Sequence, residues 1–259
     1  MNIDSIFCNT VDSERLFVGF GRTFGTNIVL ENYLNHVFEK NVVHRKSINL
    51  NNKTIIEWGW SLERILCIQQ KLYNVFELTR GTNLRNEFGA PIYTIEHFLS
   101  ALYMLGITDL FIEIDGNELP IIDGSAHKFL ELMEENIVEL EDEVEELVIT
   151  EPIYVSKGDK YVIGLPYDGY KITYAINFNH SFLKSQLLEM EITYENYKEE
   201  IAKARTFCFD YELDYLKANN LALGGSLDNA IVITKDKVLN PGGLRYEDEF
   251  VRHKMLDII

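Results

Sequence analysis

A histidine and an aspartate four residues apart near the end of the sequence could hold a metal ion. His253 and Asp257 lie in FVRHKMLD, whose helical spacing puts both side chains on one face, one turn apart. An imidazole and a carboxylate suit a borderline cation such as zinc, which keeps one position open for water at catalytic sites. The pair also arises often by chance, so an exposed or core-edge hydrogen bond is the alternative interpretation.

Glu96 and His97 could complete this site from another part of the chain. They are adjacent at the start of a predicted helix, where neighbouring side chains point about 100° apart. His97 could therefore bind a metal while Glu96 reaches the water beside it and accepts its proton. Taken alone, the two residues fit a capping carboxylate and a packed imidazole more readily.

The elements that must position these residues mix helices and strands. A helix is predicted over residues 95–105, with Thr94 as its N-cap and Gly106 as its stop, and a last helix begins near Asp248. Other helical patterns cover residues 194–204 and 210–218 and begin near residue 126. Strand patterns cover residues 110–114, 148–155, 161–165, 171–178 and 230–234.

An acidic segment separates two parts of the chain. Residues 131–146 are acidic at nearly every polar position, which favours a solvated helix face or a connector between domains, with a specific acidic binding site as the alternative. We therefore predict an α+β chain of two sheet-plus-helix layered domains, with the active site at their interface. The predicted parts are residues 1–135, of which 1–75 are difficult to assign, a connector at 136–147, and residues 148–259.

Composition restricts the possible classes of function. The chain is 46% hydrophobic and 25% charged, as expected of a folded protein, and its formal charge of −17 disfavours a nucleic-acid partner. Cys8, Cys67 and Cys208 are isolated, which suggests neither a disulfide framework nor a thiolate metal site. Without a basic and apolar leader or a long apolar run, we expect a cytoplasmic protein that does not insert into membranes. We also expect a monomer.

Five blocks of the sequence resemble UDP-3-O-acyl-N-acetylglucosamine deacetylase. In order, they are TIEHFLSAL (94–102), IEIDGNELPIIDGSAHKF (112–129), ARTFCF (204–209), LALGGSLDNAIV (221–232) and LRYEDEFVRHKMLD (244–257). The resemblance implies a small-molecule substrate, a UDP-sugar that carries an acyl chain. Hydrolysis of its acetamide would give UDP-3-O-acyl-glucosamine and acetate, the committed step of lipid A biosynthesis. The implied cofactor is zinc, with iron as the alternative in the cell.

The resemblance also implies a role for each site residue. His97, His253 and Asp257 would hold zinc, Glu96 would be the general base, Thr206 would help to bind the oxyanion, and Lys254 would lie near the substrate's sugar or diphosphate. The fatty acyl chain would lie in a hydrophobic passage lined by Phe207, Phe209, Leu213, Gly225 and Ser226. Without the resemblance, Thr206 reads as a strand residue, Lys254 as a solvated cation, and the aromatic residues as ordinary core. His36, His44 and His180 read as surface residues, and His127 as surface or as a neighbour of the ligands.

The sequence departs from this family near both ends. The glycine-histidine turn that opens family members has its nearest counterpart at residues 19–25, with Thr23 at the histidine position. Family members continue beyond Ile259 to a general-acid histidine, so we expect this chain to be truncated and impaired in protonating the leaving amine, a step worth about 10²–10⁴-fold. Two alternatives stay open. One is a truncated or degenerate paralogue that binds zinc or nucleotide-sugar without efficient turnover, and the other is a zinc amidase for another N-acyl sugar.

Overall fold

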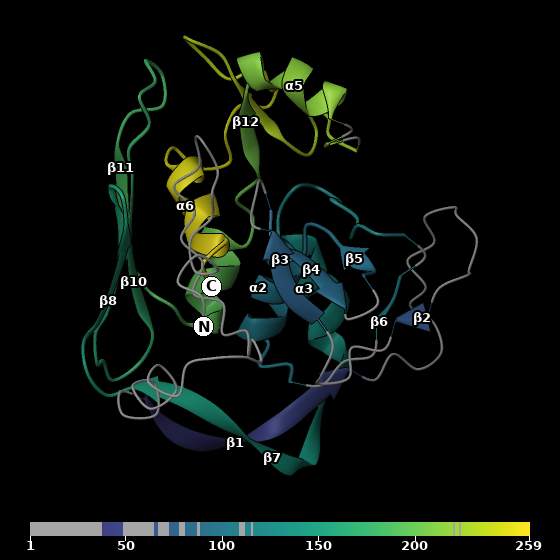
Figure 1. The fold of residues 1–259 in the computed structure, drawn as a ribbon, viewed down its shortest axis with the longest axis vertical. Helices are drawn as coiled ribbons and strands as arrows, with labels where there is room; N and C mark the ends of the chain where they lie inside the picture. The colour runs from purple at the N-terminus through teal and green to yellow at the C-terminus, as the bar shows by residue number, and fades with distance from the viewer. Residues whose placement is uncertain are drawn as a thin grey trace. The chain divides into compact units, whose positions relative to one another are not determined.

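The computed structural model describes most of the chain from residue 38 onward (Figure 1). The described residues are 38–48, 65–66, 73–77, 81–86, 89–108, 112–114, 116–219, 221–222 and 224–259. Helices and small sheets occur together in them, which confirms the α+β class. The predicted turn at residues 19–25 and His36 lie outside the described residues. Within the described ranges, no helix combines the length and the apolar character that crossing a bilayer requires.

Two compact units interleave along the sequence. The first consists of Met1–Glu96, Leu105–Leu119 and Met133–Asp168, and the second of His97–Met104, Pro120–Leu132 and Gly169–Ile259. The predicted division into domains at residues 136–147 stays a prediction.

Antiparallel strands make up most of the described part of the first unit. β3 (Tyr73–Glu77), β4 (Asn83–Asn86) and β5 (Pro91–Ile92) form a three-stranded sheet, and β2 (Ile65–Leu66) pairs with β6 (Ile112–Glu113). β8 (Ile153–Lys157) and β9 (Lys160–Gly164) form a hairpin. Gly158 provides the positive φ of 64° in its turn. A short 3₁₀ helix, η2, covers Glu134–Asn136.

Residues 137–146 of the acidic segment belong to a strand, so the interpretation of this part as a helix face is wrong. β7 (Ile137–Ile149) pairs antiparallel with β1 (Phe38–Ile48) over almost its whole length. Val138, Leu140, Val144 and Val148 all occupy even-numbered positions, but Asp142 and Glu146 interrupt the alternation and leave spacings of four that also fit a helix. The sequence pattern alone therefore does not identify this strand. β7 ends before Pro152, whose missing N–H and fixed φ interrupt the strand predicted across residues 148–155.

The second unit carries most of the helices. α2 (Glu96–Met104), of which all but Glu96 belongs to this unit, and α3 (His127–Met133) come first, followed by the antiparallel pair β10 (Lys171–Ile176) and β11 (Gln186–Glu191). The remaining elements are α4 (Tyr194–Asn196), the π-helical turn η3 (Tyr197–Ile201), β12 (Phe207–Phe209), η4 (Asp210–Glu212), α5 (Leu213–Ala218), β13 (Ile231–Ile233) and α6 (Glu249–Leu256).

α6 packs beside the β10–β11 pair, as Figure 1 shows. Side chains alternate along β10, so that Tyr174 and Ile176 are buried while their neighbours are exposed. Phe250 and Met255 of α6 are almost completely buried. Burial of these apolar side chains holds a helix that is too short to be stable alone.

A tight turn at Gly124, just before α3, is hydrogen-bonded to the residue that precedes β12. Gly124 has a φ of +80°, and a Cβ at this position would lie 1.6 Å from the carbonyl oxygen of Asn229, so only glycine fits. The Gly124 carbonyl accepts a hydrogen bond from the Thr206 amide at 3.0 Å. The next strand residues, Phe207–Phe209, then pair in parallel with β13.

Most of the predicted helices are confirmed, whereas one predicted cap is wrong. α2 begins and ends close to the predicted positions, α3 and α6 begin close to theirs, and Gly106, with a φ of 67°, follows α2 as expected. The Thr94 hydroxyl, however, donates to Glu118 at 2.9 Å instead of capping α2.

Candidate metal centre

α6 presents His253 and Asp257 from the same side. The His253 side chain is completely buried and Asp257, the residue that follows the last turn, is 6% exposed. Their spacing of one turn brings His253 Nε2 to 3.6 Å from Asp257 Oδ2. The prediction that these two residues share one helix face is therefore confirmed.

α2 supplies a third buried polar side chain to the same place. His97 Nε2 lies 3.8 Å from Asp257 Oδ1, and the rings of His97 and His253 meet edge to face with centroids 5.1 Å apart. One nitrogen or oxygen atom from each of His97, His253 and Asp257 lies within 4.8 Å of the others. Segments that are far apart in the sequence thus converge on one point of the second unit.

The chemistry of these three side chains fits a transition-metal cation. Two imidazoles and one carboxylate are the nitrogen and oxygen donors that a catalytic zinc site uses, leaving a fourth position for water. Within the described part of the chain, His97 Nε2 is buried and has no hydrogen-bond partner. A buried nitrogen in this state has lost its hydration without compensation, which a coordinated cation would provide.

Packing around α2 fixes the direction in which His97 points. Ser100, one turn after His97, shares a 2.7 Å hydrogen bond with Tyr197 of the π-helical turn. Tyr197 is fully buried, and this burial raises the pKa of its phenol well above the usual value, so the group stays neutral. Phe98 meets Phe129 of α3 edge to face. Neighbours on two sides of α2 therefore set its rotation.

Lys254 is buried beside the candidate ligands, so its interpretation as a solvated helix cation is wrong. Its Nζ lies 3.4 Å from Asp257 Oδ2 and 5.2 Å from the centre of the Phe207 ring. A carboxylate and an aromatic face both stabilise an ammonium group that has lost its water. The structure therefore places the Lys254 amine next to a candidate ligand, Asp257.

Phe207 of β12 packs against one of the candidate ligands, and Thr206 directly precedes it in the chain. The Thr206 amide donates to Gly124, and its carbonyl accepts from the Ile231 amide at 2.8 Å, so its backbone is held on both sides. The Phe207 ring packs against His253, with centroids 5.9 Å apart. Phe207 is therefore a packed aromatic residue, as its sequence pattern suggested, and it also lies next to a candidate ligand.

Glu96 is a buried carboxylate directly before His97 in the chain. It is 4% exposed, and its Oε2 accepts a hydrogen bond from the Thr82 amide at 2.9 Å. Glu96 belongs to the first unit and His97 to the second. Its role as general base stays a prediction.

The residues predicted to bind the acyl chain lie in several elements. Phe207 and Phe209 belong to an aromatic cluster with Phe178, in which each ring meets another edge to face. Leu213 begins α5 and is half-buried, whereas Gly225 and Ser226 lie in an exposed turn before β13. The structure brings the two phenylalanines together, and the passage itself stays a prediction.

Two of the remaining histidines have identified partners. His127 is half-buried and its Nε2 lies 3.0 Å from Glu131 one turn later. His180, predicted to be a surface residue, is half-buried instead: its Nδ1 accepts the amide of Leu183 at 3.1 Å, and its ring lies 4.8 Å from that of Phe209. His44 lies in β1.

A buried ion pair that sequence reasoning missed lies at the start of α6. Arg205 and Glu249 are almost completely buried, with Arg205 Nε 2.9 Å from Glu249 Oε1. Arg252, on another face of the helix, pairs with Asp248 and Glu200. Although burial opposes its charge, hydrogen bonds and attraction from these two carboxylates raise the pKa of Arg252. The only sequence signal was one charged residue in ARTFCF and another among the many charges of LRYEDEFVRHKMLD, and one sequence cannot separate such residues from surface charges.

Comparison with protein families matches residues 59–259 to the model described as UDP-3-O-acyl N-acetylglycosamine deacetylase. Proteins named UDP-3-O-acyl-N-acetylglucosamine deacetylase are similar to this chain. The one from Shewanella violacea is 45% identical over 209 residues, which cover 80% of this chain and 68% of the relative. The one from Shewanella piezotolerans is 45% identical over 186 residues, 71% of this chain and 61% of the relative. The one from Idiomarina loihiensis is 43% identical over 181 residues, which cover 69% of this chain and 59% of the relative. The chain thus spans about three fifths to two thirds of the length of these relatives.

Proposed function

Because the chain belongs to the UDP-3-O-acyl N-acetylglycosamine deacetylase family, we propose that it is a zinc-dependent amide hydrolase of lipid A biosynthesis. Its substrate is UDP-3-O-acyl-N-acetylglucosamine, as the names of its relatives indicate. Hydrolysis of the acetamide releases acetate and leaves the free amine. The observation that carries this proposal is the meeting of His97, His253 and Asp257 at one point.

The three candidate ligands would hold zinc with a position left for water. A bound zinc ion supplies Lewis-acid activation of a water and of the amide carbonyl. Zinc is favoured over magnesium or calcium because two of the donors are imidazoles, whereas those hard cations prefer oxygen.

The chain's own side chains supply the general base and the charge stabilisation. Glu96 accepts the proton of the attacking water as general base, a role that typically contributes about 10²–10⁴-fold. The Thr206 hydroxyl donates a hydrogen bond to the developing oxyanion, and loss of such a donor costs about 2.7–4 kcal/mol of transition-state stabilisation. Lys254, held by Asp257 at 3.4 Å, provides a positive charge for the anionic nucleotide-sugar.

The acyl chain of the substrate is proposed to lie against the aromatic cluster of β12. Phe207 provides apolar surface next to His253 and packs against Phe209, and each methylene buried there would contribute about 0.8 kcal/mol to binding. Leu213, Gly225 and Ser226 would continue this passage. The placement of the active site at an interface of two layered domains, the monomeric state and the cytoplasmic location stay predictions.

Acetate release by the purified chain tests the proposed activity. The wild-type chain is incubated with zinc and UDP-3-O-acyl-N-acetylglucosamine, and separately with UDP-N-acetylglucosamine, which lacks the acyl chain. We expect acetate from the acylated substrate at a rate above that of the His253→Ala variant, and much less from the sugar without the chain. Equal rates with both sugars, or release by the variant as fast as by wild type, would contradict the proposal.

A further inference from the structure

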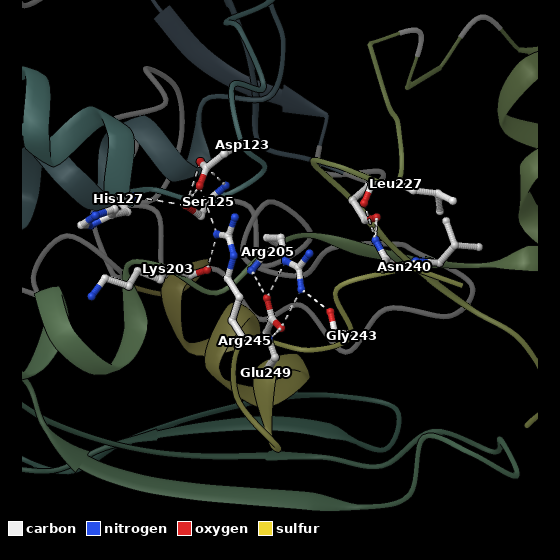
Figure 2. A network of polar contacts seen from close by, with 12 residues as sticks. Asp123, Ser125, His127, Lys203, Arg205, Leu227, Asn240, Gly243, Arg245 and Glu249 are labelled. Atoms are coloured by element: carbon white, nitrogen blue, oxygen red, sulfur yellow. Dashed lines mark hydrogen bonds and ion pairs between the residues drawn. The ribbon is translucent and has the colours of Figure 1, made fainter. Parts of the chain in front are cut away.

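The buried pair Arg205–Glu249 makes more contacts than charge neutralisation needs (Figure 2). Glu249 Oε1 accepts from the Arg205 backbone amide at 3.0 Å and from its Nε at 2.9 Å. Glu249 Oε2 accepts from Arg205 Nη2 at 3.2 Å and from the Arg245 amide at 2.6 Å. Four donors thus use the roughly four lone-pair directions of an ionised carboxylate, in the forked geometry that fixes orientation as well as distance.

Glu249 lies on the same stripe of α6 as the candidate ligands. Glu249, His253 and Asp257 follow one another at intervals of four residues, which places them on one face, one turn apart. α6 spans eight residues, so contacts with its surroundings must determine its rotation and its axial position. A slip of one residue would turn the stripe by about 100° and carry both ligands away from His97.

The other half of the pair belongs to the segment that leads into β12. Arg205 directly precedes Thr206, and its guanidinium also donates to the Gly243 carbonyl at 2.8 Å. Arg245, whose amide completes the contacts of Glu249, donates through its side chain to Asp123 at 3.1 Å, beside the Gly124 turn (Figure 2). One network therefore joins the start of α6, the start of β12 and the Gly124 turn.

We propose that Arg205 and Glu249 are positioning residues for the metal centre. The forked hydrogen bonding between their side chains sets the register of α6 against β12. It thereby holds His253 and Asp257 where they meet His97. This inference rests on the metal site in the proposed function, but its test measures metal binding and does not depend on turnover.

The test compares Glu249→Gln and Arg205→Lys with the wild-type chain. Zinc affinity is measured by competition with a chelator, ligand geometry by the visible spectrum of the cobalt-substituted protein, and stability by thermal unfolding. We expect zinc to bind about 10–100-fold more weakly in both variants, as is typical when a residue that orients a ligand is changed. The cobalt bands should also shift, because the ligands no longer meet in the same arrangement.

Arg252→Gln is the matched control, because it removes two ion pairs from the same helix on a different face. It should lower the unfolding temperature and leave the zinc affinity and the cobalt spectrum unchanged. Positioning is overturned if Glu249→Gln lowers stability but keeps wild-type zinc affinity, or if Arg252→Gln weakens zinc equally. If Glu249→Gln does not fold, Arg205→Lys, which keeps the charge, decides by the same readouts.

The outcomes also separate this inference from the proposed activity. A wild-type chain that binds zinc without releasing acetate would contradict the activity, and the comparison of zinc affinities would still decide the role of the pair. A wild-type chain that binds neither zinc nor cobalt would overturn the metal site and the positioning role together.

Discussion

His97, His253 and Asp257 are polar side chains whose removal from water is unfavourable unless other contacts offset it. Lys254 lies close to Asp257 and compensates part of its charge. A cation shared by the two imidazoles and the carboxylate would compensate all three. The residue-scale predictions therefore concern metal binding first and catalysis second.

Replacing His97 by alanine should abolish stoichiometric zinc binding, because it removes the donor from α2 and leaves only the pair on α6. Zinc bound per chain after gel filtration, measured by atomic absorption, checks this. His127→Ala is the control, since His127 is a half-buried histidine that pairs with Glu131 instead. Retention of one zinc per chain by His97→Ala would contradict the site.

Replacing Glu96 by glutamine should separate catalysis from metal binding. The glutamine side chain still offers an oxygen to the Thr82 amide, which Glu96 now binds, but it cannot accept a proton from water. We expect full zinc content and a kcat for acetate release lower by about 10²–10⁴-fold. A kcat within a few-fold of wild type would remove Glu96 from the role of general base.

At the scale of elements, turns with special backbone geometry bring the site together. Gly124 allows the chain before α3 to pass close to Asn229, and its carbonyl anchors Thr206 at the start of β12. The contact is between backbone atoms, so a side chain at this position cannot be accommodated by a change of rotamer.

Gly124→Ala should destabilise the protein by more than about 2 kcal/mol, since the new Cβ would lie 1.6 Å from a backbone oxygen. Gly158→Ala is the matched control: this glycine also has a positive φ, 64°, but a Cβ there meets nothing within 4 Å. Backbone strain alone should cost the control about 1 kcal/mol. Urea unfolding midpoints compare the two, and equal losses would contradict the account of the Gly124 turn.

At the scale of the whole molecule, the sequence reveals some features much better than others. The proximity of the candidate ligands His253 and Asp257 was predictable because a helix brings residues four positions apart onto one face. Their meeting with His97 is a tertiary contact: the residue types allowed it as one of two interpretations, and the family resemblance decided between them. β7 was misread because Asp142 and Glu146 break its alternation of apolar and polar residues. The Arg205–Glu249 pair could not be predicted, since the burial of a charge depends on the rest of the fold.

Zinc should stabilise the whole chain, because the candidate ligands come from α2 and α6 at distant positions in the sequence. Binding to the folded state alone contributes about 2.7 kcal/mol when free zinc is 100-fold above its Kd. The unfolding temperature should therefore fall on treatment with a chelator and recover with zinc, but not with magnesium. An unfolding temperature that is the same with and without zinc would argue against a metal-linked fold.

The most direct test of the metal centre is anomalous scattering at the zinc absorption edge from crystals of the zinc-loaded chain. We predict one strong peak within bonding distance of His97, His253 and Asp257, about 2.0–2.2 Å from each donor atom. A zinc-loaded chain whose peak lies elsewhere, or touches only one of the three side chains, would contradict the central claim.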